Sequence, residues 1–250
     1  CAPPLPGHPV TGGGLRTAQL LATLAAGKHS VLPIIERAAL PDDAPEALRR
    51  FAFGPGELGE VIARAAPSVL VVEQWALVEQ LGAIDLPLAL DLHGSLLLEN
   101  VYRRGRLDLV LDAKSKLHAL HRADLLLAPA AAQLHHFAAW ATLAGFDPRE
   151  LPLSLLPLAP PAAPAAARET KMPPLTMVYG GARWPWIDSQ EALITVAGLL
   201  PDLPGATVQI ATFDPPRHGL PFEEDLGTWP ALLDALRDRP GVSVHDGLGH

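Results

Sequence analysis

Asp91 and His93 are the first side chains of interest, because they end the apolar run of the stretch "PLALDLHG". Such a run predicts a buried strand, and open α/β sheets bind ligands at the carboxyl ends of their strands. Alternate residues of a strand point the same way, so Asp91 and His93 should share a face. A histidine placed there can act as a general base, a hydrogen-bond donor or a metal ligand, or can bond to nearby backbone.

Three consecutive glycines form a second candidate site near the start of the chain. Gly12, Gly13 and Gly14 lead straight into a helical pattern at residues 15–26. A glycine turn before a helix lets the backbone approach an anion, which the helix dipole also attracts. Arg16 lies in the first turn of this helix and can add a charge-assisted contact. The motif is not G-x-G-x-x-G, so a purely structural tight turn is an equal interpretation.

A glycine pair also occurs in "YGGARWPWID", between a predicted strand and a predicted helix. Gly180 and Gly181 permit close approach of the backbone, and Arg183 offers a cation. The indole of Trp186 offers a stacking face or a hydrogen-bond donor. Ordinary packing does not account for this combination, so we expect the segment to bind a ligand.

The remaining histidines do not predict a metal site. His118 and His121 would share a helix face, as zinc ligands can, but no cysteine or carboxylate pattern completes a site around them. His135 and His136 are adjacent in a predicted helix, and adjacent side chains of a helix point in different directions. We therefore predict no bound metal.

The composition excludes several classes of protein. The chain has 250 residues, of which 49% are hydrophobic, enough for a large core in one or two domains. Its net charge is −8 with no basic stripe, which argues against a nucleic-acid partner. No apolar run is long enough to span a membrane, the first residues do not resemble a secretory signal, and the single cysteine excludes an internal disulfide. We expect a soluble cytoplasmic protein.

Short apolar runs alternate with longer helical patterns, which predicts βαβ units and an α/β fold built on parallel sheets. Strands are expected at residues 30–35, 68–73, 87–94, 123–129, 175–181, 206–213 and 242–246. Helices are expected at residues 15–26, 57–66, 74–82, 96–122, 130–144, 188–200 and 229–239.

A stretch rich in proline and alanine divides the chain. Residues 159–174 cannot hold regular structure, because prolines interrupt them repeatedly, and they predict a linker between two domains. Residues 1–158 would form the first domain and residues 175–250 the second. The second domain has only about three expected strands, fewer than a usual sheet, so we expect it to be incomplete.

Three stretches resemble the GT-B glycosyltransferases, and within them a group of the glycosyltransferase family 4 type. "PVTGGGLRTAQLLATLA" is similar to that group's opening loop and first helix, and "HRADLLLAPAAAQLHHFAAWATLAGF" to its fifth strand and next helix. "VYGGARWPWID" is similar to its "WGGGIWNWFD"-type segment, with departures at Pro185 and Ile187. The resemblance implies two Rossmann-like domains with parallel sheets, the first on the acceptor side and the second binding the donor.

The activity implied by the resemblance is transfer of a sugar from a nucleotide-sugar donor to an acceptor, in the cleft between the domains. Members of this family generally retain the anomeric configuration and need no catalytic metal. No cofactor is therefore expected, because the nucleotide-sugar serves as a co-substrate. The acceptor would be a glycan, a lipid-linked molecule or a small molecule, and peripheral contact with a membrane stays open.

The resemblance also implies roles for individual residues. His93 matches the acceptor-domain histidine that helps to position the transferred sugar, and Gly13 and Gly14 would border the diphosphate. The family's phosphate-binding pair, an arginine and a lysine, is represented by Arg183 alone, and the similar group usually has an apolar residue at that position. The donor phosphates would then depend on backbone N–H groups and helix N-termini as well.

The family pattern further predicts that this sequence is a fragment. The family's first strand would precede the glycines, and its Glu-x7-Glu-type acidic motif does not occur before His250. Such a fragment would have little activity. Two alternatives stay open: a nucleotide-sugar 2-epimerase of similar architecture, which needs carboxylates at the sugar, and a degenerate, non-catalytic relative that binds glycans or protein partners.

Overall fold

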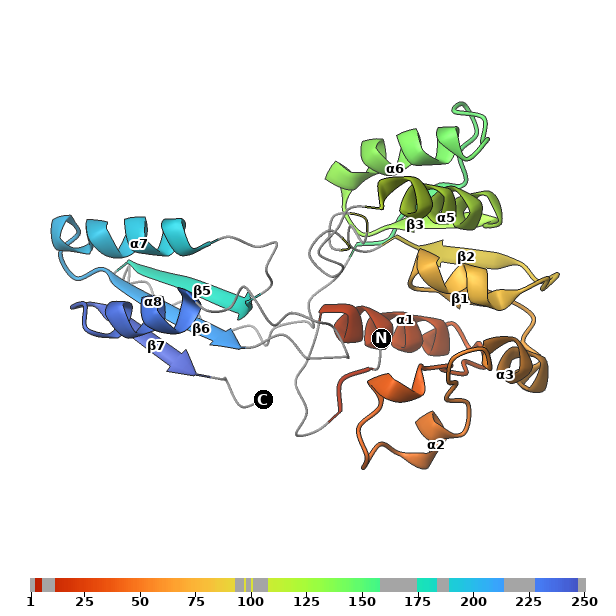
Figure 1. Cartoon of the computed structure of the whole chain (residues 1–250), viewed down its shortest axis with the longest axis horizontal. Coiled ribbons are helices and arrows are strands. Elements are labelled where there is room, and N and C mark those ends of the chain that lie inside the picture. The colour runs from red at the N-terminus through yellow and green to blue at the C-terminus, as the bar shows by residue number, and fades with distance from the viewer. Residues whose placement is uncertain are drawn as a thin grey trace. The chain divides into compact units, whose positions relative to one another are not determined.

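The computed structural model describes residues 3–5, 12–92, 97, 100, 108–157, 175–183, 189–213 and 228–246. The chain divides into two compact units, the first made of Cys1–Leu97 and Asp108–Pro161 and the second of Leu98–Leu107 and Ala162–His250. Each unit has its own parallel sheet (Figure 1). Each also has its own cluster of buried hydrophobic residues. The expected linker at residues 159–174 lies outside the described residues.

Four parallel strands form the sheet of the first unit. They are β1 (Leu70–Val72), β2 (Leu88–Asp91), β3 (Leu125–Ala128) and β4 (Leu153–Leu155), in the order β1-β2-β3-β4. The register aligns Val72 with Leu90, Leu90 with Leu126, and Leu126 with Leu153. A row of branched apolar side chains therefore crosses the sheet, as expected for strands that are covered by helices.

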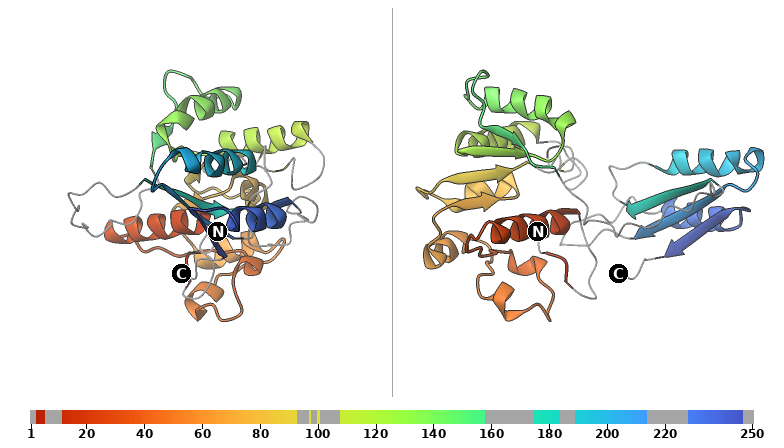
Figure 2. Two further views of the ribbon diagram at one scale, coloured as in Figure 1. Left: turned by 90° about the vertical axis from the view of Figure 1, so that its left-hand side faces the viewer. Right: turned by 180° about the vertical axis from the view of Figure 1, so that it is seen from behind.

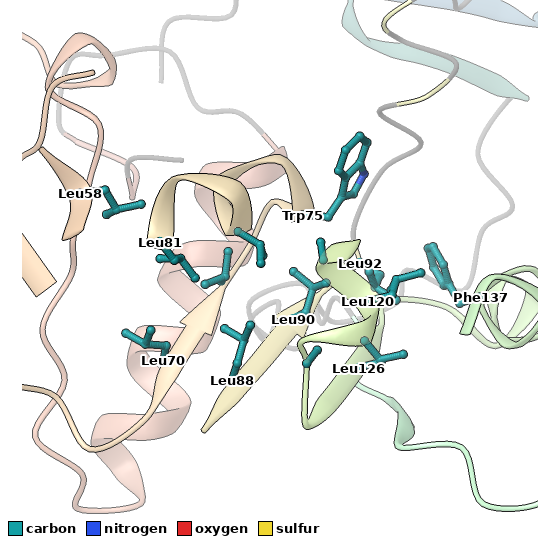
Figure 3. Packing of buried hydrophobic residues seen from close by; sticks show 14 of the residues in the cluster. Leu58, Leu70, Trp75, Leu81, Leu88, Leu90, Leu92, Leu120, Leu126 and Phe137 are labelled. Atoms are coloured by element: carbon teal, nitrogen blue, oxygen red, sulfur yellow. The ribbon is translucent and has the colours of Figure 1, made fainter. Parts of the chain in front are cut away.

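The core of the first unit lies against alternate residues of these strands, among them Leu88, Leu90 and Leu126 (Figure 3). The elements that cover it are α3 (Leu58–Ala65), the 3₁₀ helix η2 (Trp75–Leu81), α5 (Leu109–His121) and α6 (Ala131–Leu143). The rest of the unit includes α1 (Gly12–Ala26), the 3₁₀ helix η1 (Arg37–Ala39) and the short α2 (Glu46–Arg49).

The second unit has a three-stranded parallel sheet. Its strands are β5 (Thr176–Ala182), β6 (Thr207–Phe213) and β7 (Val242–Asp246), which lie side by side and point the same way (Figure 2). The helices are α7 (Gln190–Leu199), the 3₁₀ helix η3 (Leu200–Asp202) and α8 (Thr228–Arg237). Val208 and Ile210 of β6 are buried in one cluster with Leu193 of α7 and with Trp229 and Leu233 of α8.

One expected strand is wrong. Residues 30–35 form no strand, and the only pairing of this part of the described chain is an isolated parallel bridge between Glu36 and Phe53. Pro33 stands in the middle of the segment, and proline has no N–H to give to a neighbouring strand. Around the bridge, the Phe53 N–H donates to the Ile35 carbonyl and the Arg37 N–H donates to the Phe53 carbonyl.

Two expected helices differ in detail. The segment expected as a helix at residues 74–82 is the 3₁₀ helix η2. Of the long helix expected at residues 96–122, the second half is described and corresponds to α5. None of the helices among the described residues is both long and apolar enough to cross a bilayer.

Candidate functional site

The three glycines near the start of the chain are the first residues of a helix. α1 begins at Gly12, three residues earlier than the pattern predicted, so Gly12, Gly13 and Gly14 form its first turn. Within the described part of the chain, nothing lies within 4 Å of the point that a Cβ on Gly12 would occupy. Packing inside the unit therefore does not explain why Gly12 is a glycine. The open space leaves its backbone accessible to a ligand.

Arg16 and Asp91 form a buried ion pair between α1 and the last residue of β2. The Arg16 Nε donates to Asp91 Oδ2 at 2.9 Å, and Nη2 donates to Oδ1 at 2.8 Å. The two side chains are 2% and 0% exposed. This is the two-point geometry in which a planar guanidinium matches a carboxylate.

A third nitrogen of the same guanidinium reaches the end of the sheet. Arg16 Nη1 donates to the Pro157 carbonyl at 3.2 Å, and Gln19 Nε2 of α1 donates to that carbonyl at 3.1 Å. Pro157 lies two residues after β4. Three of the five N–H groups of Arg16 are therefore directed at protein acceptors. Direct contact of Arg16 with a ligand stays a prediction, and the structure gives this side chain a role inside the unit.

A second polar contact joins α1 to the neighbouring strand. Thr17 Oγ1 lies 2.7 Å from Glu73 Oε2 and 3.0 Å from the Gly13 carbonyl oxygen, so its hydroxyl proton can be donated to either. Glu73 directly follows β1, as Asp91 ends β2. Glu73 follows the buried core residue Val72, and Asp91 follows the buried core residue Leu90. Because successive side chains of a strand point to opposite faces, both acidic side chains lie on the face away from that core. α1 is therefore attached by polar side chains to the sheet face opposite the main core.

His93 and Trp186 lie outside the described residues. The chain is described as far as Leu92, whose N–H donates to the Leu127 carbonyl at 2.8 Å and so extends the pairing of β2 with β3 by one residue. His93 is the next residue in the chain. The structure thus brings Gly12–Gly14, Arg16 and Asp91 together at the carboxyl edge of the first sheet, where the sequence predicted a site.

The second glycine pair lies at the carboxyl end of β5. Gly180 and Gly181 pair with Ala211 and Thr212 of β6. Gly181 has a φ of 149°, a backbone conformation that side-chain-bearing residues rarely adopt. Arg183 follows the strand directly and is half-buried. The glycine at position 181 is therefore required by the backbone, and the pair lies at the edge where open α/β sheets bind ligands.

Two polar groups near this edge were missed by the sequence interpretation. The Tyr179 hydroxyl is 2.6 Å from Ser189 Oγ, the residue before α7, and the Tyr179 ring stacks on Trp229 of α8 with centroids 6.3 Å apart. Tyr179 therefore links β5 to α8 and to the residue that precedes α7. Alternation along β5 could have placed Tyr179 in the core, but no local signal identifies Ser189 as its partner.

The described residues contain no group of three or more His, Cys, Asp or Glu side chains arranged to hold a metal ion. His121 Nδ1 instead lies 3.0 Å from the Ala144 carbonyl oxygen at the end of α6. His136 packs edge-on against Phe137 and Trp140. These contacts give two of the helical histidines an ordinary packing role.

No model of a known protein family matches the chain, and no curated protein matches its sequence. Its structure is similar to that of a sucrose-phosphate synthase from Thermosynechococcus elongatus, with a TM-score of 0.57 and 13% sequence identity. The similarity covers 96% of this chain and 66% of the synthase, so the chain spans just under two thirds of that protein's length. At this identity the likeness concerns the fold alone. The chain therefore has the α/β fold with parallel sheets that is found in this GT-B glycosyltransferase.

Proposed function

We propose that the chain belongs to a glycosyltransferase of the family 4 type, which transfers a sugar from a nucleotide-diphosphate sugar to an acceptor. The observation that carries the proposal is the fold likeness to a sucrose-phosphate synthase over 96% of the chain. It is supported by the position of the glycine turn of α1 at the carboxyl edge of the first sheet. Retention of the anomeric configuration and independence from metal belong to the same proposal.

The chemical task is to stabilise the negative charge of the departing nucleoside diphosphate. Without a metal, backbone N–H groups, helix N-termini and cationic side chains must supply that stabilisation. Gly12, which is exposed in the first turn of α1, can present its backbone N–H to the diphosphate, and Gly181 allows a close approach in the second unit. Arg183 would add a positive charge, Trp186 a stacking face, and His93 a hydrogen bond that orients the sugar.

The epimerase alternative is less well supported by the first unit. An epimerase needs carboxylates that can exchange protons with the sugar. The acidic residues at the ends of β1 and β2 are instead bonded to α1, Glu73 through Thr17 and Asp91 through Arg16. Asp91 is also 1% exposed. This arrangement suits a structural role for both carboxylates and favours transfer over epimerisation.

The proposal is tested by incubating the full-length protein with a panel of nucleotide-sugars and candidate acceptors. Acceptors should include a small-molecule glycoside, an oligosaccharide and a lipid-linked sugar. Mass spectrometry of the acceptor detects transfer, and calorimetry detects binding of each nucleoside diphosphate. We expect transfer from one donor and binding of its diphosphate. Epimerised donor in the absence of acceptor would support the epimerase, and glycan binding without turnover would support the non-catalytic alternative.

A further inference from the structure

We infer that Arg16 and Asp91 form a positioning pair, which fixes the start of the segment after β2 relative to the glycine turn of α1. The inference rests on the proposed function, because that segment begins with Leu92 and His93. Neither residue of the pair needs to touch the sugar. Arg16 acts through Asp91, and Asp91 acts through the backbone that it shares with Leu92, the residue before His93 in the sequence.

The geometry of the pair fixes the carboxylate of Asp91. Both carboxylate oxygens of Asp91 accept from one guanidinium, at 2.8 and 2.9 Å, so the carboxylate can neither rotate nor slide without breaking a bond. An aspartate side chain has only one carbon between its carboxylate and the backbone. Holding the carboxylate therefore holds the backbone of residue 91, the last of β2.

Both charged side chains of the pair are buried. Placing two charges in a site where they are 2% and 0% exposed is costly, and well-packed apolar residues often give a protein equal or greater stability. Stability alone is then a weak reason for this pair. The ion pair fixes the orientation of the two side chains, which an apolar pair cannot do, because apolar contacts have no preferred direction.

The guanidinium of Arg16 connects three segments of the first unit. Arg16 lies in the first turns of α1, holds the end of β2, and donates to Pro157 beyond β4. Leu92 is held on its other side by the Leu127 carbonyl. The glycine turn and the residue before His93 are thereby tied to one rigid group. α1 also has an independent attachment through Thr17 and Glu73, so loss of the pair should leave the helix in place.

The test uses variants of the full chain that separate orientation from stability. Arg16→Met with Asp91→Leu replaces the pair by apolar residues, and Arg16→Lys keeps the charge but loses the two-point geometry. Arg37→Met with Glu57→Leu is the matched control, because that pair is exposed at 60% and 45%. Melting temperature, kcat and the KM for the donor are measured for each, together with hydrogen exchange at Leu92 and in the first turn of α1.

A positioning role predicts that the apolar double variant folds but has a kcat lowered about tenfold or more, since small misplacements of reacting groups have effects of this size. Its KM should change by less than about threefold, and Arg16→Lys should show the same pattern. The control should match the wild type. A folded double variant with wild-type kcat would overturn the inference and leave the proposed function standing.

Hydrogen exchange decides the inference separately from activity. In the substrate-free double variant, the Leu92 amide should exchange about tenfold faster or more, while amides of β3 keep their wild-type rate. Unchanged exchange at Leu92 would overturn the inference. If the wild type transfers no sugar, the proposed function fails, and faster exchange at Leu92 alone would still show that the pair holds this segment. Should the double variant not fold, the same two readings are taken from Arg16→Lys.

Discussion

The Lys116 ammonium on α5 lies 4.2 Å from the centroid of the Trp140 ring on α6 and 5.5 Å from that of Phe137. Its side chain is 3% exposed. Two aromatic faces thus surround a cation that is almost fully buried, an arrangement that offsets part of its lost hydration. Burial nevertheless lowers the pKa of Lys116 from 10.5 to about 8.

This relationship predicts a stability that rises with pH above neutrality. Between pH 8 and 10.5 the unfolded chain holds the Lys116 proton and the folded protein has released it, so raising the pH favours folding. The cost of the charge is fully present below pH 8 and amounts to roughly 3 kcal/mol. Burial and the Lys116 charge also lower the pKa of the neighbouring His136. Charging His136 therefore lowers the free energy of unfolding only when the pH falls below the usual histidine pKa of 6.5.

The measurement is urea unfolding of the wild type and of Lys116→Met at several pH values from 7 to 10.5. We expect Lys116→Met to raise the free energy of unfolding at pH 7 by roughly 1–3 kcal/mol, with the difference vanishing near pH 10.5. Lys114→Met is the control, because Lys114 is exposed on the same helix and should change little. A difference that is independent of pH would contradict this assignment.

Arg16→Met alone should be strongly destabilising. It removes both hydrogen bonds that the guanidinium gives to a carboxylate with 0% exposure, and such a loss typically lowers the free energy of unfolding by about 3–5 kcal/mol. Adding Asp91→Leu should restore most of that loss, because no buried charge is left. Chemical denaturation of the two single variants and the double variant gives the coupling energy, and additive effects would be incompatible with the pair.

Gly181→Ala should destabilise the second unit while Gly180→Ala is tolerated. The φ of 149° at Gly181 is unfavourable for alanine, at a cost of roughly 1–3 kcal/mol. At Gly180 a new Cβ would meet its nearest atom, the Ala211 carbonyl oxygen, at 3.9 Å, an ordinary contact. Thermal unfolding followed by circular dichroism compares the two variants. Equal melting temperatures would argue against the backbone requirement at Gly181.

Tyr179→Phe should cost about 1 kcal/mol of stability, because it removes the hydrogen bond to Ser189 and keeps the ring that stacks on Trp229. Ser189→Ala should cost a similar amount. The double variant should be little worse than either single one, since both remove the same bond. Urea unfolding of the three variants would show strictly additive losses if the two hydroxyls did not interact.

Most strands could be predicted for a physical reason, although β4 was not expected. The run that contains Asp91 was recognisable because a buried parallel strand is continuously apolar. The run that contains Tyr179 was recognisable from its apolar residues before the glycine pair, although Val178 of β5 is 73% exposed. The prediction of a strand at residues 30–35 was wrong, because apolar composition does not reveal whether a segment that contains Pro33 can pair with a neighbouring strand.

The candidate site was only partly predictable. Alternation and strand ends located Asp91 and the glycine turns, since these are local properties of the chain. The partner of Arg16 was not predictable, because it lies 75 residues away along the sequence and the ion pair arises only when α1 packs on the sheet. A charged residue within a helical pattern carries no local sign of whether it faces solvent or a buried carboxylate.

We propose that the chain takes part in sugar transfer from a nucleotide-sugar and that His93 orients the sugar. The most direct measurement compares turnover of the wild type and His93→Ala with the best donor of the panel, at matched folded fraction. We expect the full-length wild type to transfer sugar and His93→Ala in the same protein to be at least about a hundredfold slower, with an unchanged melting temperature, as for other positioned groups in catalysis. Absence of transfer by the wild type with every donor, or an unchanged rate in His93→Ala, would contradict the account.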